Sequence, residues 1–379
     1  MAAATSPVTP TVVAWAIEED GRSFEDLAEA LKVPVDDVQA WASGDAAPTR
    51  GQVTSLAKEL RRPRVLFFMP APPEAASLPS SFRHPPGVAR NVSPKIRRAG
   101  RESRRIQATV AWARREAEPV DVPILSPAST SAVQAARVVR EWLGIEEAVQ
   151  LRWKTEYQAL AAWREALEAR GLLVFALQLG ADEVRGFSTW DDHAPLIAFN
   201  TSGVTPPARI FTMGHELGHL VARLDATCLN PDEVDLADGP VIERWCEEFA
   251  AALLMPSTLV RTVTEEAGIA AGEADLETVK LLMRRARVSG RAAALRLIAL
   301  GWASPHLYGA VVAAFRPAKK SSGTPQSPPR YEARLRSYGS GVIQTVFEAL
   351  PTLDALRVLR IEVPDARRLA AEMPELRVP

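Results

Sequence analysis

The sequence predicts an α+β protein, and three observations support that fold class. Apolar residues recur with helical spacing toward both ends of the chain, three short apolar runs near the middle have strand character, and a helical run with two histidines follows them. With 379 residues the chain is long enough for two or three domains. We expect a helical domain at 8–66, a linker and Arg-rich connector at 71–130, an α+β domain at 131–300, and a helical region at 301–379 containing a linker at 319–330.

Composition favours a cytoplasmic protein. The net charge is −1, so any affinity for nucleic acid must come from a local patch. Two cysteines, Cys228 and Cys246, are too few for a disulfide framework. The first residues lack the basic and apolar regions of a signal peptide, and no apolar run approaches the roughly 20 residues that span a bilayer. We therefore expect no membrane association.

Short helices with recognisable ends fill the N-terminal segment. Ser23 is placed to cap a helix over 24–32, and Gly44 to end one over 35–43. Thr49 is placed to cap a third helix over 51–60. Two short helices joined by a tight turn have the geometry of a helix-turn-helix.

Residues 23–60 resemble the repressor-type (Xre-like) helix-turn-helix family, with matching signals at Trp41-Ala42-Ser43-Gly44 and Pro48-Thr49. That resemblance implies DNA recognition by the second helix. Its exposed positions include Asp36 and Asp37 but no Lys or Arg, so it offers nothing to meet phosphate. A module that binds DNA and one that binds protein, or only packs, are both open; the charge fits the second better.

A strongly basic segment follows. Residues 1–70 carry a net charge of −3, whereas residues 83–115 hold ten Lys/Arg against Glu102 alone. We expect a helix from about Ser93 to Ala117 with a basic stripe. Either the stripe pairs with acidic neighbours such as the N-terminal segment, or it binds nucleic acid. The candidate contacts are Arg97, Arg98, Arg101, Arg104 and Arg105.

The middle of the chain alternates in type. A helix over 156–171 ends at Gly171, and three strands are expected at 172–179, 183–190 and 195–200. Two long helices are then expected over 209–224 and 241–255. We expect the last strand, Pro195-Leu196-Ile197-Ala198-Phe199-Asn200, to form the sheet edge and to accept substrate as an added strand.

The first of these long helices carries a candidate metal site. His215 and His219 are four residues apart, so both imidazoles lie on one face and can meet one ion. Glu216 lies beside that face and can reach a water bound to the ion without occupying a ligand position. Neutral imidazoles suit Zn²⁺, which brings the pKa of bound water within reach of a carboxylate base.

Catalytic zinc needs a third protein ligand. One candidate is Asp225, ten residues after His215, although Ala222 stands where the required bend needs glycine. The favoured candidate is Glu243 on the next helix, as in thermolysin-like sites, with Glu247 orienting one of the histidines. Cys246 is expected to pack in the core, with a role as a stray ligand the less favoured alternative.

Residues 208–224 and 242–256 together resemble the ImmA/IrrE family of metallopeptidases (the M78 type). Matching positions of the second helix are Glu243, Arg244, Phe249, Ala250 and Pro256; Glu247 stands where the family has Asn. The resemblance implies a zinc endopeptidase of narrow specificity, ligated by Glu243, whose substrate is often a helix-turn-helix repressor in a stress or mobile-element response. An Xre-like module fused to such a domain is familiar in that family.

Some roles stay open at this level. A donor to the tetrahedral oxyanion is expected from His193 or Tyr308. Residues 331–379 suggest two or three further helices and name no ligand, and the sequence indicates no oligomeric state. The rival functional interpretation is a DNA-binding regulator or antitoxin-like protein whose peptidase-like domain serves as a sensor.

Overall fold

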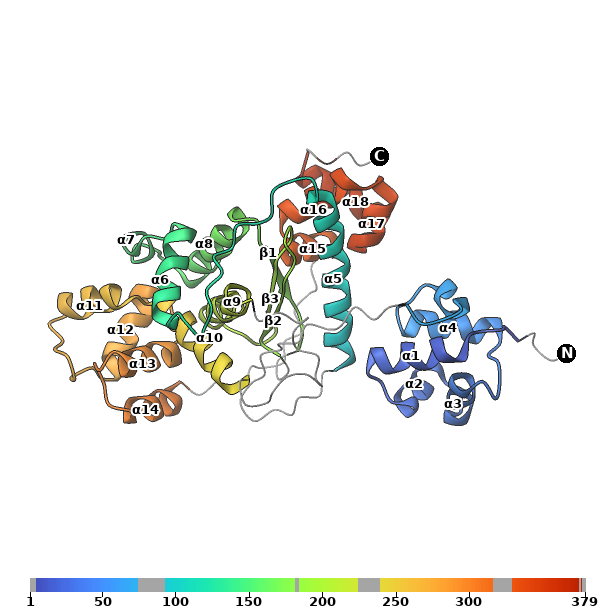
Figure 1. Ribbon diagram of the computed structural model, residues 1–379, viewed down its shortest axis with the longest axis horizontal. Helices are drawn as coiled ribbons and strands as arrows, with labels where there is room; N and C mark the ends of the chain where they lie inside the picture. Colours follow the sequence, from blue (N-terminus) through green and yellow to red (C-terminus); the bar gives the residue numbers. More distant parts are fainter. Residues whose placement is uncertain are drawn as a thin grey trace. The chain divides into compact units, whose positions relative to one another are not determined.

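The computed structural model describes residues 5–73, 93–180, 184–223, 239–315, 329–374 and 376. The chain divides into two compact units (Figure 1). The N-terminal unit comprises Met1–Leu78 and Gly87–Glu102, and the C-terminal unit comprises Pro79–Pro86 and Ser103–Pro379. Among the described residues, no helix is both long enough and apolar enough to cross a membrane.

Short capped helices build the N-terminal unit, as predicted. They are α1 Pro10–Asp20, α2 Phe24–Leu31, α3 Val35–Ser43, α4 Arg50–Glu59, the 3-10 helix η1 Arg64–Phe68 and the first part of α5 Pro94–Arg114. The Ser23 hydroxyl accepts the Asp26 N–H at 3.1 Å. Thr49 forms a capping box with Gln52, and Gly44 ends α3 in the left-handed conformation with φ 94°. All three predicted helix boundaries are therefore confirmed.

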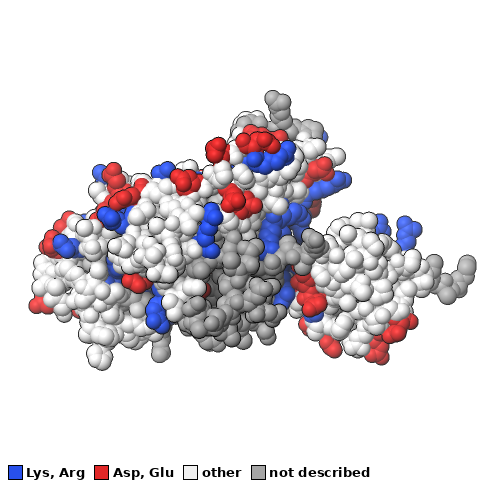
Figure 2. Space-filling view, in the orientation of Figure 1, with Lys and Arg blue, Asp and Glu red and all other residues white. Residues whose placement is uncertain are grey.

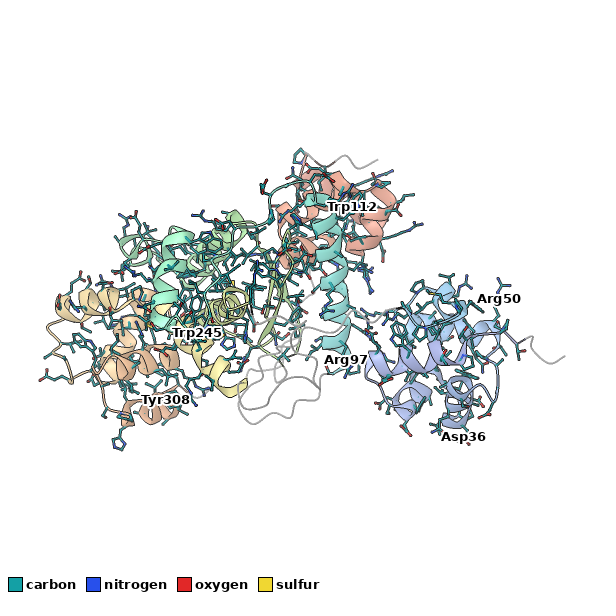
Figure 3. The ribbon with its side chains drawn as sticks, viewed as in Figure 1. Asp36, Arg50, Arg97, Trp112, Trp245 and Tyr308 are labelled. Carbon is teal, nitrogen blue, oxygen red and sulfur yellow. The ribbon has the colours of Figure 1, made fainter. Side chains whose placement is uncertain are left out.

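Apolar faces of these helices meet in one core. Leu27, Val38, Trp41 and Leu56 are buried there. By contrast, the first turn of α3 carries Asp36 and Asp37, and Figure 2 shows acidic side chains on the face of the unit that bears α3, where Figure 3 labels Asp36. The helices and their core match the expected layout, while the identity of this unit as a helix-turn-helix stays a prediction.

The C-terminal unit is rich in helices and contains one small sheet, so the predicted mixture of helix and strand is confirmed. Its elements after α5 are α6 Ala132–Leu143, α7 Glu147–Gln150, α8 Glu156–Ala169, β1 Leu173–Leu177, β2 Gly186–Thr189, β3 Leu196–Asn200, α9 Pro206–Val221, α10 Gly239–Leu254, α11 Ser257–Glu266, α12 Leu276–Ala286, α13 Gly290–Ala299, α14 His306–Ala314, α15 Arg330–Tyr338, α16 Ser340–Ala349, α17 Thr352–Leu359 and α18 Val363–Glu372.

The strands are ordered β1-β3-β2, with β3 parallel to β1 and antiparallel to β2. The expectation that residues 195–200 form the sheet edge is therefore wrong, because β3 is the central strand. Every residue of β3 is buried, which suits a strand covered on both sides and flanked by two neighbours. The edge strand next to α9 is β2.

Helix α9 lies at the centre of this unit, packed against β2, β3, α8 and α10 (Figure 1). It begins with Pro206 and Pro207, whose missing N–H groups are tolerated in a first turn. Nearly all of its later residues are buried, so its polar side chains face protein rather than bulk water. Such burial is costly for polar groups unless they are paired.

Residues 331–379 were expected to form two or three helices, but the described part of this region contains four, α15–α18. Pro351 and Gly339 separate the short helices, which helical periodicity alone merges. Helix α15 packs on β1, where the rings of Phe175 and Tyr338 meet edge to face at 4.8 Å. The C-terminal helices thus cover the β1 side of the sheet.

Candidate metal centre

His215 and His219 lie one turn apart on α9 and are both almost fully buried, with exposed fractions of 1% and 5%. Glu243, near the start of α10, reaches them from the neighbouring helix. Its side chain is 49% exposed, so the cluster has one open side. Two helices that are adjacent in space but separated in sequence therefore supply the three groups.

Distances within this cluster fit a single small cation. The two imidazole Nε2 atoms are 3.2 Å apart, and the Glu243 carboxylate oxygens lie 3.1 Å from His215 Nε2 and 3.3 Å from His219 Nε2. Tetrahedral zinc with ligand bonds of about 2.0–2.1 Å separates its ligand atoms by about 3.3–3.4 Å. These three residues form a His-His-Glu group that can hold a metal ion.

Protonation in the metal-free cluster follows from these contacts. Burial lowers the pKa of His219, but hydrogen bonds with Cys246 and Glu243 raise it by more, so it lies well above its ordinary 6.5. Burial raises the pKa of Glu243, whereas hydrogen bonds from His215 and His219 lower it by more, well below its usual range. Without a cation, a protonated imidazole therefore pairs with a carboxylate.

We expect metal affinity to rise with pH. Coordination needs a neutral imidazole, so the proton on His219 must leave, and each displaced proton weakens binding by about tenfold per pH unit below its pKa. Zinc titrations against a competing chelator between pH 6 and 8 measure this slope. In the metal-free protein the Glu243–His219 pair contributes fully to the free energy of unfolding between about pH 4.5 and 6.5. This contribution is lost as pH falls through the lowered pKa of Glu243, and also as pH rises through the raised pKa of His219. An affinity that does not change with pH would contradict the assigned ligands.

Glu216 is the fourth ionisable group of the site and is fully buried. Ser188 of β2 donates a hydrogen bond from its hydroxyl to Glu216 Oε2 at 3.0 Å. The carboxylate is thus oriented by the edge strand rather than by its own helix. Ser188 was not among the sequence-predicted site residues, although its spacing of two from Gly186 places both on one face of a strand.

Gly186 allows β2 to approach α9 this closely. A Cβ at this position would lie 2.5 Å from Thr212 Cγ2 and 2.6 Å from the Ala198 carbonyl oxygen. Both distances are too short, and the backbone oxygen belongs to the central strand and cannot turn aside. Glycine is therefore required where the strand passes Glu216.

We expect Gly186→Ala to lower the free energy of unfolding by about 1–3 kcal/mol through overpacking. It should also displace Ser188 from Glu216, because the strand must move away from α9. Gly309→Ala on α14 is the matched control: nothing lies within 4 Å of its added Cβ, so a neutral effect or a gain of up to about 1 kcal/mol is expected. Denaturant unfolding of both variants tests this, and equal stabilities would refute the close-approach argument.

The other predicted groups near the ion are placed as follows. Cys246 is fully buried, and burial raises the pKa of its thiol. Its Sγ would be 3.3 Å from a Cβ on Gly218, and the thiol contributes to the raised pKa of His219, a relation the sequence did not reveal. Glu247 is exposed, and its orienting role stays a prediction. The alternative third ligand, Asp225, lies outside the described residues.

Neither suggested oxyanion donor is brought to the metal cluster by a described contact. His193 lies in the turn between β2 and β3, where its N–H donates to Asp191 and its carbonyl accepts from Arg114. Tyr308 is on α14, which Figures 1 and 3 show away from α9. Their assignment as donors stays a prediction.

The arginines of α5 make specific contacts within their own units. Arg98 and Arg101 both bind the fully buried carboxylate of Asp20, with N–O distances of 2.9–3.1 Å. Arg105 donates to the Val358 carbonyl at 2.7 Å, and burial lowers the pKa of Arg104. Arg97, labelled in Figure 3, lies against Gly21. The contacts of Arg98 and Arg101 match the interpretation that the stripe pairs with acidic neighbours, whereas Arg105 binds a carbonyl; nucleic-acid binding stays a prediction.

The solved structures include a similar chain, described as a Mycobacterium tuberculosis transcriptional regulator. The two are 18% identical, the alignment covers 54% of each chain, and the TM-score is 0.32. This chain thus spans about half the length of that protein. No curated protein matches the sequence.

One family model matches the part of the chain that holds the cluster. Its matched region begins at the end of α8 and runs into α13, so it includes all three strands, α9 and α10. His215, Glu216, His219 and Glu243 all fall inside it. Residues 167–297 match the Peptidase_M78 family, described as the IrrE N-terminal-like domain.

Proposed function

We propose that the protein is a zinc-dependent endopeptidase, with His215, His219 and Glu243 as zinc ligands and Glu216 as general base. The observation that carries this proposal is the convergence of three ligand atoms at 3.1–3.3 Å beside a buried carboxylate that is not itself one of them. The Peptidase_M78 match over 167–297 supports a role of the metallopeptidase or regulator kind.

When bound, Zn²⁺ supplies Lewis-acid polarisation of the scissile carbonyl and acidifies water at the site. Glu216 takes a proton from the attacking water on its carboxylate and returns it to the leaving amine. The Ser188 hydroxyl bonded to Oε2 keeps that carboxylate in one orientation during both transfers. Burial of Glu216 excludes bulk water from the base.

Substrate binds along β2 as an added strand. The Asn200 N–H donates to the Arg185 carbonyl, so hydrogen-bonded pairs alternate along the two strands from this position. Gly186 and Ser188 then direct their main-chain groups away from β3, toward the free edge. An extended peptide paired there passes the strand residue that holds Glu216.

The physiological substrate is a helix-turn-helix repressor or similar regulatory protein, as the ImmA/IrrE resemblance implies. The N-terminal unit recruits this partner by contacts with the protein rather than by binding DNA. Its acidic α3, with Asp36 and Asp37 in the first turn, is unsuited to phosphate. If the N-terminal unit recruits proteins of its own fold, the peptidase acts on a narrow set of substrates.

Metal removal and restoration test the proposal. Purified protein is stripped with a chelator, and peptide cleavage of a co-expressed candidate repressor is followed by mass spectrometry before and after zinc is added back. We expect cleavage at one or a few bonds that disappears on chelation and returns with one equivalent of zinc. Stoichiometric zinc with sequence-specific DNA binding and no cleavage would favour a regulator with a peptidase-like sensor instead.

A further inference from the structure

A second concave site lies in the C-terminal unit and shares no lining residue with the metal centre. It is a half-open cavity of about 730 Å³ bounded by α6, α7, the start of α11, α13 and the C-terminal end of α10. This volume lies within the range of small-molecule sites, about 300–1,000 Å³. The proposed peptidase chemistry makes no use of it.

Two buried arginines line this cavity. Arg140 is 7% exposed and Arg296 is 3% exposed. Arg140 donates to the Leu253 carbonyl at 2.7 Å, and Arg296 Nε donates to the Met255 carbonyl at 2.8 Å. These bonds satisfy the carbonyl end of α10, where the helix dipole favours positive charge. Capping of the C-terminal end of α10 therefore uses some of the hydrogen-bond donors of each guanidinium.

The rest of the Arg140 guanidinium is already bound, because its Nη2 donates to Gln150 Oε1 at 2.8 Å, whereas Arg296 makes no second bond of this kind to a described residue. Within the described ranges, neither arginine has a carboxylate oxygen within 4.0 Å, and both Nη groups of Arg296 lack a hydrogen-bond acceptor. Burial lowers the pKa of Arg140 to about 10 and also lowers that of Arg296, although the negative charges of Glu147 and Glu248, respectively, oppose these shifts. A buried guanidinium with unsatisfied donors is costly, and the cavity that Arg296 lines lets an anion reach those donors.

The remaining lining restricts the kind of anion. Val133, Ala136 and Ala252 give the walls an apolar character. Glu141, Glu146 and Glu147 also line the cavity, and their negative charges disfavour a ligand with more than one negative charge. Planar carboxylates match the fork of a guanidinium, which can bind both oxygens.

We propose that this cavity binds a small organic monocarboxylate, its carboxylate on Arg296 and its apolar part against the α6 and α10 walls. Benzoate is a suitable probe, with benzamide as its uncharged counterpart and inorganic phosphate as a multiply charged anion. Isothermal titration on the full-length, metal-free protein avoids binding of benzoate to zinc. We expect saturable binding of one benzoate, at least tenfold weaker binding of benzamide, and none of phosphate.

A pair of tryptophan variants locates the binding. Ser257 is exposed at the start of α11 and lines the cavity, so Ser257→Trp fills it without touching the buried arginines. Thr262, exposed on the same helix, does not line it, so Thr262→Trp is the matched control. We expect Ser257→Trp to abolish benzoate binding and Thr262→Trp to leave it unchanged.

Arg296→Lys keeps the charge but loses the guanidinium fork and should weaken benzoate binding several-fold; its helix content by circular dichroism verifies folding. Three results would each overturn the proposal. They are benzoate binding that survives Ser257→Trp, benzamide binding as tight as that of benzoate, and no benzoate binding at concentrations on the order of 10 mM. Because every measurement uses metal-free protein, its failure is separate from failure of the peptidase assignment.

Discussion

Glu216→Gln is expected to lower kcat for peptide cleavage by about 10²–10⁴-fold, the usual contribution of a general base, while zinc remains bound. The amide has the shape of the carboxylate and its oxygen still accepts the Ser188 hydroxyl, so the fold around it should be kept. Zinc content is measured by mass spectrometry of the metal, and cleavage by quantifying peptide fragments. A variant that retained wild-type cleavage would remove Glu216 from the mechanism.

Ser188→Ala separates orientation from chemistry. It leaves the base in place but removes a hydrogen bond to a buried carboxylate, which costs about 1–3 kcal/mol. We expect a smaller loss of kcat than for Glu216→Gln, with an altered pH profile of kcat, because the carboxylate loses a donor that favours its charged form. An unchanged pH profile would mean that Ser188 only packs against the helix.

Glu243→Ala is expected to weaken zinc binding by more than about 100-fold. Even groups that merely orient a ligand change affinity by about 10–100-fold, and Glu243 contacts both histidines directly. Its loss leaves two imidazoles, one fewer than the three protein ligands of a catalytic zinc site. Competition with a chromophoric chelator at fixed pH measures the change.

Glu247→Ala is the matched control on the same exposed side of α10. It removes the same charge four residues away, so any general electrostatic effect on the cation is common to both variants. We expect its zinc affinity to fall by about 10–100-fold, the usual effect of a residue that orients a ligand, and thus by less than in Glu243→Ala. Equal losses in the two variants would show that total charge, rather than direct ligation, holds the ion.

Local patterns in the sequence predicted most of the helices and the first half of the site. The four-residue spacing of His215 and His219 is a property of one helix, and the caps at Ser23 and Thr49 act within one turn. Interactions between residues a few positions apart can be predicted from sequence patterns. Glu243 was predicted by comparison with thermolysin-like sites and from the ImmA/IrrE resemblance rather than from local spacing, because its approach to α9 depends on how two helices pack.

Long-range placement was harder to predict. Strand periodicity does not state strand order, so β3 was taken for an edge although it is central. The contact of Ser188 with Glu216 crosses 28 residues and exists only because Gly186 lets β2 close on α9. Cys246 was expected to be a core residue, which it is, but its effect on the pKa of His219 depends on the rotation of α10.

Gln107 has a consequence for how this protein can be divided. Its buried side-chain amide on α5 donates to the Thr189 carbonyl at 3.1 Å and to the Ala194 carbonyl at 2.9 Å, at the two ends of the β2–β3 turn. A fragment that begins at residue 131, the domain boundary expected from the sequence, would lose these two hydrogen bonds to the turn that follows β2, the strand that orients Glu216. A fragment that keeps these contacts must therefore begin before Gln107, so part of the predicted connector belongs to the scaffold of the candidate site.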